Sequence, residues 1–176
     1  MWQTDSMLEW IETQLEDGPR LRLFASPAGI RGIEFVHPDS PRPVPSNARH
    51  ATGPVPLLVE ARCQLEAYFH GELREFQLPL DFEGTDFQGR VWRQLQTIPY
   101  GQTRSYSQIA QAIGSPQAIR AVGAANGANP IAIVVPCHRV IGANGKLVGY
   151  GGGLPLKKRL LELEGVVTAS LYGIVP

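Results

Sequence analysis

Cysteine, histidine and arginine are adjacent at Cys137, His138 and Arg139, within the segment IVVPCHRVIGANGK. A cysteine thiolate can act as a nucleophile or a metal ligand, and a neighbouring histidine can relay a proton. A structural zinc site needs about four ligands at recognisable spacing. No second Cys or His pair accompanies this one, so we expect no metal site. A buried structural thiol and a nucleophile both remain open.

The residues around Cys137 bear on how it could react. The aliphatic run at residues 131–135 predicts a buried strand that ends at Pro136. The basic surroundings are expected to favour the thiolate. Successive side chains of an extended segment point to opposite sides, so His138 is expected to reach the sulfur through a water. Glu162 and Glu164, the only acidic residues after Asp86, are the candidates to orient its ring.

Composition indicates an ordinary globular protein. The 176 residues are 43% hydrophobic and 18% charged. With only two cysteines, a disulfide scaffold is excluded and a cytoplasmic setting is expected. The opening MWQTDSMLEW lacks the pattern of a secretory signal, and the run at 131–135 is too short to span a membrane.

The net charge of zero conceals an asymmetry. Residues 1–84 hold 7 Lys and Arg against 13 Asp and Glu, whereas residues 85–176 hold 9 against 3. No acidic residue occurs between Asp86 and Glu162. A long basic stretch without acids indicates a polyanionic partner, although chance clustering could also produce it.

The N-terminal half predicts a small antiparallel sheet with one helix. Residues 7–14, 20–26 and 30–36 read as strands, and the proline-rich residues 37–47 as a surface loop. Residues 56–71 carry apolar side chains at helical spacing, with Cys63 on the opposite face. Residues 76–82 alternate like an edge strand containing Pro79.

The C-terminal half predicts helices with clear start and stop signals. Thr85 and Ser105 each precede a glutamine at capping-box spacing, and Gly114 ends the second of these helices. Ser115 and Pro116 are expected to begin a third helix, which completes a helix-turn-helix. That helix carries little bulk apart from Arg120, so its smooth face could approach a neighbouring helix or a DNA groove.

Four collinear motifs carry a family resemblance: IPYGQTRSYSQIA, AIRAVGAANGANPIAIVVPCHRVIG, GYGGGL and LLELEG. Over about residues 82–165 the chain resembles the O6-alkylguanine-DNA alkyltransferases. The resemblance implies a ribonuclease-H-like α/β domain over residues 1–81. It also implies a mainly helical, winged-helix-like domain with the helix-turn-helix over residues 82–176.

The resemblance also implies roles for individual residues. Cys137 would accept the alkyl group, and His138 would act through a water with Glu164 behind it. Asn129 would tie the recognition helix to the active-site loop, and Tyr106 would help to rotate the nucleotide and donate a hydrogen bond to the base. The substrate-binding residues would be Tyr150, Gly151, Gly152, Val140 and Arg139. Arg120 would fill the vacated stack, with Ser107, Ser115, Ala121, Gly123 and Ala124 also at the DNA.

The implied activity is DNA repair by stoichiometric, irreversible transfer of a methyl or other alkyl group from O6 of guanine, and also O4 of thymine, to Cys137. This requires base flipping from double-stranded DNA, and no cofactor or membrane. The protein is expected to be a monomer that could bind DNA cooperatively. Two other functions fit part of the pattern: a thiol hydrolase or acyltransferase using Cys137, His138 and Glu164, and a non-catalytic helix-turn-helix DNA-binding protein.

Overall fold

The computed structural model describes residues 7–37 and 42–166. Four of the residues expected to form the proline-rich loop, 38–41, therefore lie outside the described part, as do residues 1–6 at the N-terminus. The described residues form two compact units. One runs up to Glu83 and includes Pro130–Ala132, and the other comprises Gly84–Asn129 and the residues from Ile133 onward.

The first unit is a four-stranded sheet with the strand order β3-β2-β1-β4. The strands β1 (Leu8–Gln14), β2 (Arg20–Ser26) and β3 (Gly29–Phe35) form the predicted antiparallel meander. The short β4 (Ala48–His50) pairs with β1 in parallel and was not predicted, since three mainly polar residues carry little strand signal.

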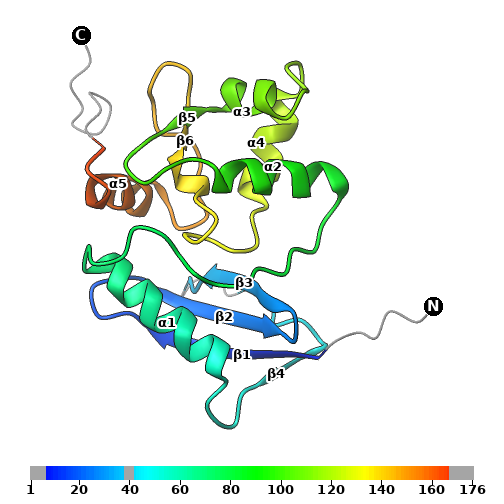
Figure 1. Cartoon of the computed structure of the whole chain (residues 1–176), viewed down its shortest axis with the longest axis vertical. Coiled ribbons are helices and arrows are strands. Elements are labelled where there is room, and N and C mark those ends of the chain that lie inside the picture. Colours follow the sequence, from blue (N-terminus) through cyan, green and yellow to red (C-terminus); the bar gives the residue numbers. More distant parts are fainter. Residues whose placement is uncertain (1–6, 38–41, 167–176) are drawn as a thin grey trace. The chain divides into compact units, whose positions relative to one another are not determined.

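The helix α1 (Pro56–Phe69) packs against β1, β2 and β3 (Figure 1). It buries the predicted apolar face, including Leu58, Leu65 and Tyr68, and leaves Cys63 exposed. The chain leaves the helix through Gly71, whose φ of 75° suits a residue without a Cβ.

The predicted strand at residues 76–82 is absent as such. Only an isolated bridge between Ile30 and Leu80 forms, in which the Ile30 N–H donates to the Pro79 carbonyl and the Asp81 N–H to the Ile30 carbonyl. Pro79 has no N–H of its own, so the ladder cannot continue through it.

Three helices make up the first part of the second unit: α2 (Asp86–Gln96), α3 (Tyr106–Ala112) and α4 (Ile119–Gly127), which pack against one another (Figure 1). Both predicted capping boxes are present, Thr85 with Gln88 and Ser105 with Gln108. Trp92 of α2 is buried and its indole N–H donates to the Ala125 carbonyl, which joins α2 to α4.

The start of α4 differs from the prediction. Ser115 does not cap the helix and Pro116 is not its first residue, because residues 115–118 form a turn in which the Ala118 N–H donates to the Ser115 carbonyl. The helix begins only at Ile119, with Ala118 as a cap that offers no side-chain acceptor. Gly114, at a φ of 69°, ends α3 as predicted.

The rest of the second unit places the CHR segment next to the last helix. The two-residue strands β5 (Arg104–Ser105) and β6 (Val140–Ile141) pair in parallel, and a 3-10 turn, η1 (Cys137–Arg139), immediately precedes β6. The helix α5 (Leu154–Leu163) packs against η1. Among the described residues, no helix has the length and apolar character needed to cross a membrane.

Candidate active site

Cys137 is buried, with 6% of its surface exposed, and is the first residue of η1. The apolar run before it is not the predicted strand. Ile133 has a φ of 71° and breaks the extended backbone, so residues 131–135 form isolated bridges around a turn. A left-handed φ is costly for a β-branched residue, so the surrounding packing must impose it.

The cysteine is held as a thiol. Burial raises the pKa of Cys137, and this outweighs the hydrogen bond from Asn129 and the charge of Lys157, which both lower it. The expectation that basic surroundings favour the thiolate is therefore wrong for this structure. Alkyl transfer to Cys137 would need a nearby base to take the thiol proton.

His138 and Glu164 form a buried pair. The His138 Nε2 lies 2.9 Å from Glu164 Oε1, and both side chains are fully buried. Burial lowers the pKa of His138 although Glu164 acts to raise it, so the ring is neutral at neutral pH. Burial would raise the pKa of Glu164, but the hydrogen bonds and charges of His138 and Arg139 lower it to about 2. Because an ionised carboxylate only accepts hydrogen bonds, Nε2 is the protonated ring nitrogen.

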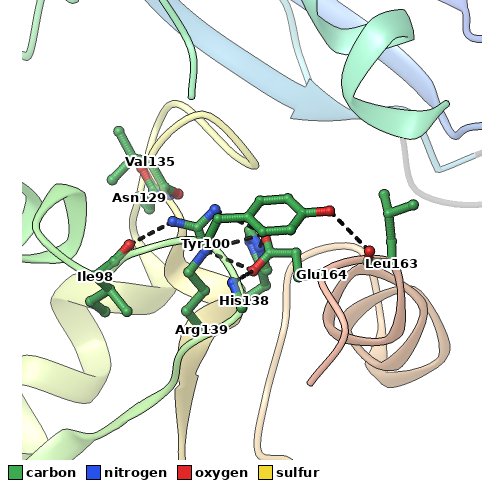
Figure 2. Close-up of polar contacts among 9 residues, drawn as sticks. Ile98, Tyr100, Asn129, Val135, His138, Arg139, Leu163 and Glu164 are labelled. Atoms are coloured by element: carbon green, nitrogen blue, oxygen red, sulfur yellow. Dashed lines mark hydrogen bonds and ion pairs between the residues drawn. The ribbon is translucent and has the colours of Figure 1, made fainter. Parts of the chain in front are cut away.

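Arg139, expected at the substrate, is committed to Glu164 instead. Its Nε donates to Glu164 Oε2 at 2.9 Å and its second terminal nitrogen to Oε1 at 2.9 Å, while its first donates to the Ile98 carbonyl at 2.6 Å (Figure 2). The guanidinium also lies over the ring of Tyr100, 5.9 Å from its centroid. A two-pronged arginine contact of this kind fixes the orientation of a carboxylate.

Two amides connect α4 and its C-terminal turn to the cysteine segment. The Asn129 side chain donates to the Val135 carbonyl at 2.8 Å (Figure 2). It also hydrogen-bonds to the Cys137 side chain. The buried Asn126 side chain donates to the Cys137 carbonyl at 3.4 Å. Asn126 was not predicted, because an amide in the middle of a helix carries no signal of what it contacts.

Lys157 is the main residue that the sequence analysis missed. It is fully buried, and its Nζ donates to the carbonyls of Val140 at 2.6 Å and Val148 at 2.8 Å. Burial lowers its pKa to about 8, against the raising effect of Cys137. The neighbouring Lys158 forms an ordinary surface pair with Glu162, so the sequence alone does not distinguish the two lysines.

The aromatic residues expected at the substrate lie around this centre. Tyr106 is the half-buried first residue of α3, and its pKa is raised by burial and by the charge of Cys137, so the hydroxyl stays protonated. A Cβ on Gly123 of α4 would lie 3.9 Å from the Tyr106 ring. The Tyr150 ring lies edge-on to His138 with centroids 6.4 Å apart. Gly151 is exposed and Gly152 half-buried in the loop that follows.

The residues expected at the DNA fall on the helix-turn-helix. Arg120, Ala121 and Ala124 are exposed on α4. Ser107 lies in the first turn of α3, and its hydroxyl is 2.8 Å from that of Ser105. Ser115 begins the 115–118 turn rather than a helix. Within the described ranges, no group of three or more His, Cys, Asp or Glu side chains could hold a metal ion.

Two family models match the chain. The 6-O-methylguanine DNA methyltransferase ribonuclease-like domain matches residues 14–82, and the DNA binding domain of the same proteins matches residues 86–166. A methylated-DNA–protein-cysteine methyltransferase from Mycobacterium bovis is 70% identical over 101 residues, which span 57% of this chain and 61% of that relative.

Solved structures match over nearly the whole chain. The O6-methylguanine methyltransferase of Mycobacterium tuberculosis is 46% identical with a TM-score of 0.81, covering 96% of this chain and all of the other. The OGT of the same organism, solved in complex with DNA, is 49% identical with a TM-score of 0.80, covering 89% of this chain and 93% of that one. The chain therefore belongs to the methylated-DNA–protein-cysteine methyltransferase family.

Proposed function

We propose that this protein repairs DNA by moving an alkyl group from O6 of guanine onto the sulfur of Cys137, once per molecule. The observation that supports this most is the buried arrangement of a protonated thiol, a neutral imidazole and an ionised carboxylate in Cys137, His138 and Glu164. Such a set supplies a base that can take the thiol proton, which the burial of Cys137 otherwise keeps on the sulfur.

The reaction is a displacement at carbon. The thiol proton passes through a water to His138, using Nδ1 because Nε2 already donates to Glu164. The sulfur then bonds to the alkyl carbon as the carbon–O6 bond breaks. The electron pair of the broken bond remains on O6 of the guanine. Tyr106, which stays protonated, donates a hydrogen bond to the base as this charge develops. The product is a thioether that water does not cleave, so each molecule acts once.

The substrate is double-stranded DNA, and the target base must leave the stack at a cost of a few kcal/mol. Arg120 is suited to fill the gap, because it is exposed on a face of α4 with little other bulk. Ser107, Ser115, Ala121, Gly123 and Ala124 lie next to the phosphates and groove. Tyr150, Gly151, Gly152 and Val140 surround the flipped base. The basic C-terminal half suits a polyanion, and salt should weaken its binding to DNA.

The protein acts as a monomer in the cytoplasm without a cofactor, and residues 1–81 and 82–176 form its two domains. The Mycobacterium tuberculosis relative solved with DNA supports DNA as the partner, and the two family models, which meet between residues 82 and 86, support this division.

The test follows the alkyl group. Duplex DNA with an isotope-labelled O6-methylguanine is incubated with the protein, which is then digested and analysed by mass spectrometry. The label is expected on the peptide containing Cys137 and absent from the Cys137→Ser protein. Label on another residue, or equal uptake by Cys137→Ser, would refute the proposal.

A further inference from the structure

We propose that Tyr100 and Gly101 are positioning residues that fix the carboxylate of Glu164, and through it the ring of His138, for alkyl transfer. The motif IPYGQTRSY contains both residues. This inference rests on the proposed function, since it concerns the same proton relay.

Glu164 needs support from outside its own helix. It is the C-terminal cap of α5, where the helix presents unpaired carbonyls and the negative end of its dipole. It is also buried, so its charge is removed from water. The helix end and the burial both destabilise the ionised carboxylate of Glu164. Hydrogen-bond donors from elsewhere in the unit compensate for both effects.

Tyr100 contacts both the end of this helix and the arginine that holds the carboxylate. Its hydroxyl donates to the carbonyl of Leu163 at 2.9 Å, one residue before Glu164. Its ring lies against the guanidinium of Arg139 (Figure 2). The Tyr100 side chain therefore limits the movement of both partners: its hydroxyl holds the helix end that carries Glu164, and its ring holds the guanidinium of Arg139.

Gly101 contacts Glu164 through its backbone. Its N–H donates to Glu164 Oε2 at 3.3 Å, and its φ of 76° lies in the left-handed region. A Cβ at this position would lie 2.9 Å from the backbone oxygen of Glu164. Both the conformation and the space therefore favour glycine.

The two residues are the central pair of a turn over residues 99–102, which the Gln102 N–H closes by donating to the Pro99 carbonyl. The carbonyl of Ile98, directly before this turn, accepts a hydrogen bond from the first terminal nitrogen of Arg139 at 2.6 Å. Residues 98–101 thus reach the carboxylate twice, directly from Gly101 and indirectly from Ile98 through Arg139. With both carboxylate oxygens of Glu164 held, Oε1 stays directed at His138 Nε2. This leaves the other ring nitrogen, Nδ1, for the proton relay.

The first test separates the hydroxyl of Tyr100 from its ring. Tyr100→Phe removes the hydrogen bond to Leu163 and keeps the ring on Arg139, whereas Tyr100→Leu removes both. We expect the single-turnover rate to fall roughly threefold to tenfold in the first variant and further in the second, the fold-change that one lost hydrogen bond implies. The acidic limb of the pH–rate profile should move to lower pH, because a less well held Glu164 raises the basicity of His138 less.

The second test uses a matched pair of glycines. Gly101→Ala and Gly71→Ala introduce the same side chain at φ values of 76° and 75°, but only the first places it against Glu164. We expect Gly101→Ala to lose roughly tenfold or more in rate, with Gly71→Ala close to wild type. Equal losses in the two variants would show that backbone strain alone is responsible and would overturn the role of Gly101.

A substrate-free measurement keeps the inference separate from the proposed function. The 15N resonances of the His138 ring report its tautomer and its bond to Glu164. They should change in Tyr100→Phe and stay as in wild type in Tyr68→Phe, a buried tyrosine of the first unit. Unchanged His138 resonances together with an unchanged rate profile in Tyr100→Phe would overturn the inference. A wild-type protein that takes up no alkyl group, while the resonances still shift, would refute the proposed function alone.

Discussion

At the scale of single residues, the site depends on buried charges that hold one another. Cys137 and His138 were expected because their types and the motif around them indicate their chemistry, whereas only the family resemblance selected Glu164 over Glu162. Lys157 and the true contacts of Arg139 were not expected, because long basic side chains are exposed in most proteins and only the fold determines which of them are buried. Here Lys157 holds two carbonyls, on β6 and in the loop before Tyr150, and its charge lowers the pKa of Cys137.

Replacing Lys157 with methionine tests this contribution. The variant keeps most of the volume but loses the ammonium, which leaves two buried carbonyls without this donor and the thiol pKa higher still. We expect the reaction of Cys137 with iodoacetamide to shift to higher pH, and alkyl transfer to slow by roughly tenfold or more. Lys158→Met is the control. The same shift in both variants would contradict a specific role for Lys157.

The charge of Glu164 should be visible in stability. A carboxyl whose pKa falls from 4.5 in the unfolded chain to about 2 in the fold stabilises the protein above pH 4.5. This stabilisation, about 3 kcal/mol, is lost as the pH falls from 4.5 towards 2. Urea unfolding at a series of pH values should show a smaller acid dependence in Glu164→Gln than in wild type. Parallel curves for the two proteins would mean that Glu164 is not ionised in this way.

At the scale of elements, the sequence correctly predicted the helix ends that are determined by interactions between residues close in the chain. The capping boxes at Thr85 and Ser105 and the helix end at Gly114 each involve residues within a few positions, and all three are present. The predicted start of α4 was wrong. A serine followed by a proline is typical of a helix start, but it is equally typical of a tight turn, and residues 115–118 form such a turn. The bend at Ile133 could not be predicted, since only tertiary packing holds a β-branched residue at that φ.

The helix α4 carries residues from both parts of the proposed function. Its exposed face carries Arg120, while Asn126 and the following Asn129 contact the cysteine segment. We expect Arg120→Ala to slow repair of O6-methylguanine in duplex DNA by roughly tenfold or more, and to leave reaction with the free methylated base nearly unchanged. Equal losses with both substrates would show that Arg120 acts on the chemistry and not on the extruded base.

At the scale of the whole molecule, the two units divide charge as well as structure. Acidic residues are concentrated before residue 84, whereas the segment between Asp86 and Glu162, which forms most of the second unit, has none. The sequence predicted the meander and α1 of the first unit and the helices of the second. It could not predict that Pro130–Ala132 joins the first unit at β3, because pairing between distant segments leaves no local pattern.

The central claim is a single, permanent transfer to Cys137, and a titration tests it most directly. A fixed amount of protein is mixed with increasing amounts of duplex DNA containing O6-methylguanine, and the repaired guanine is counted at completion. We predict a plateau at one repaired base for each active protein molecule, with the intact protein heavier by one CH2 group. Continued repair beyond that plateau, or repair without a change in protein mass, would contradict the account.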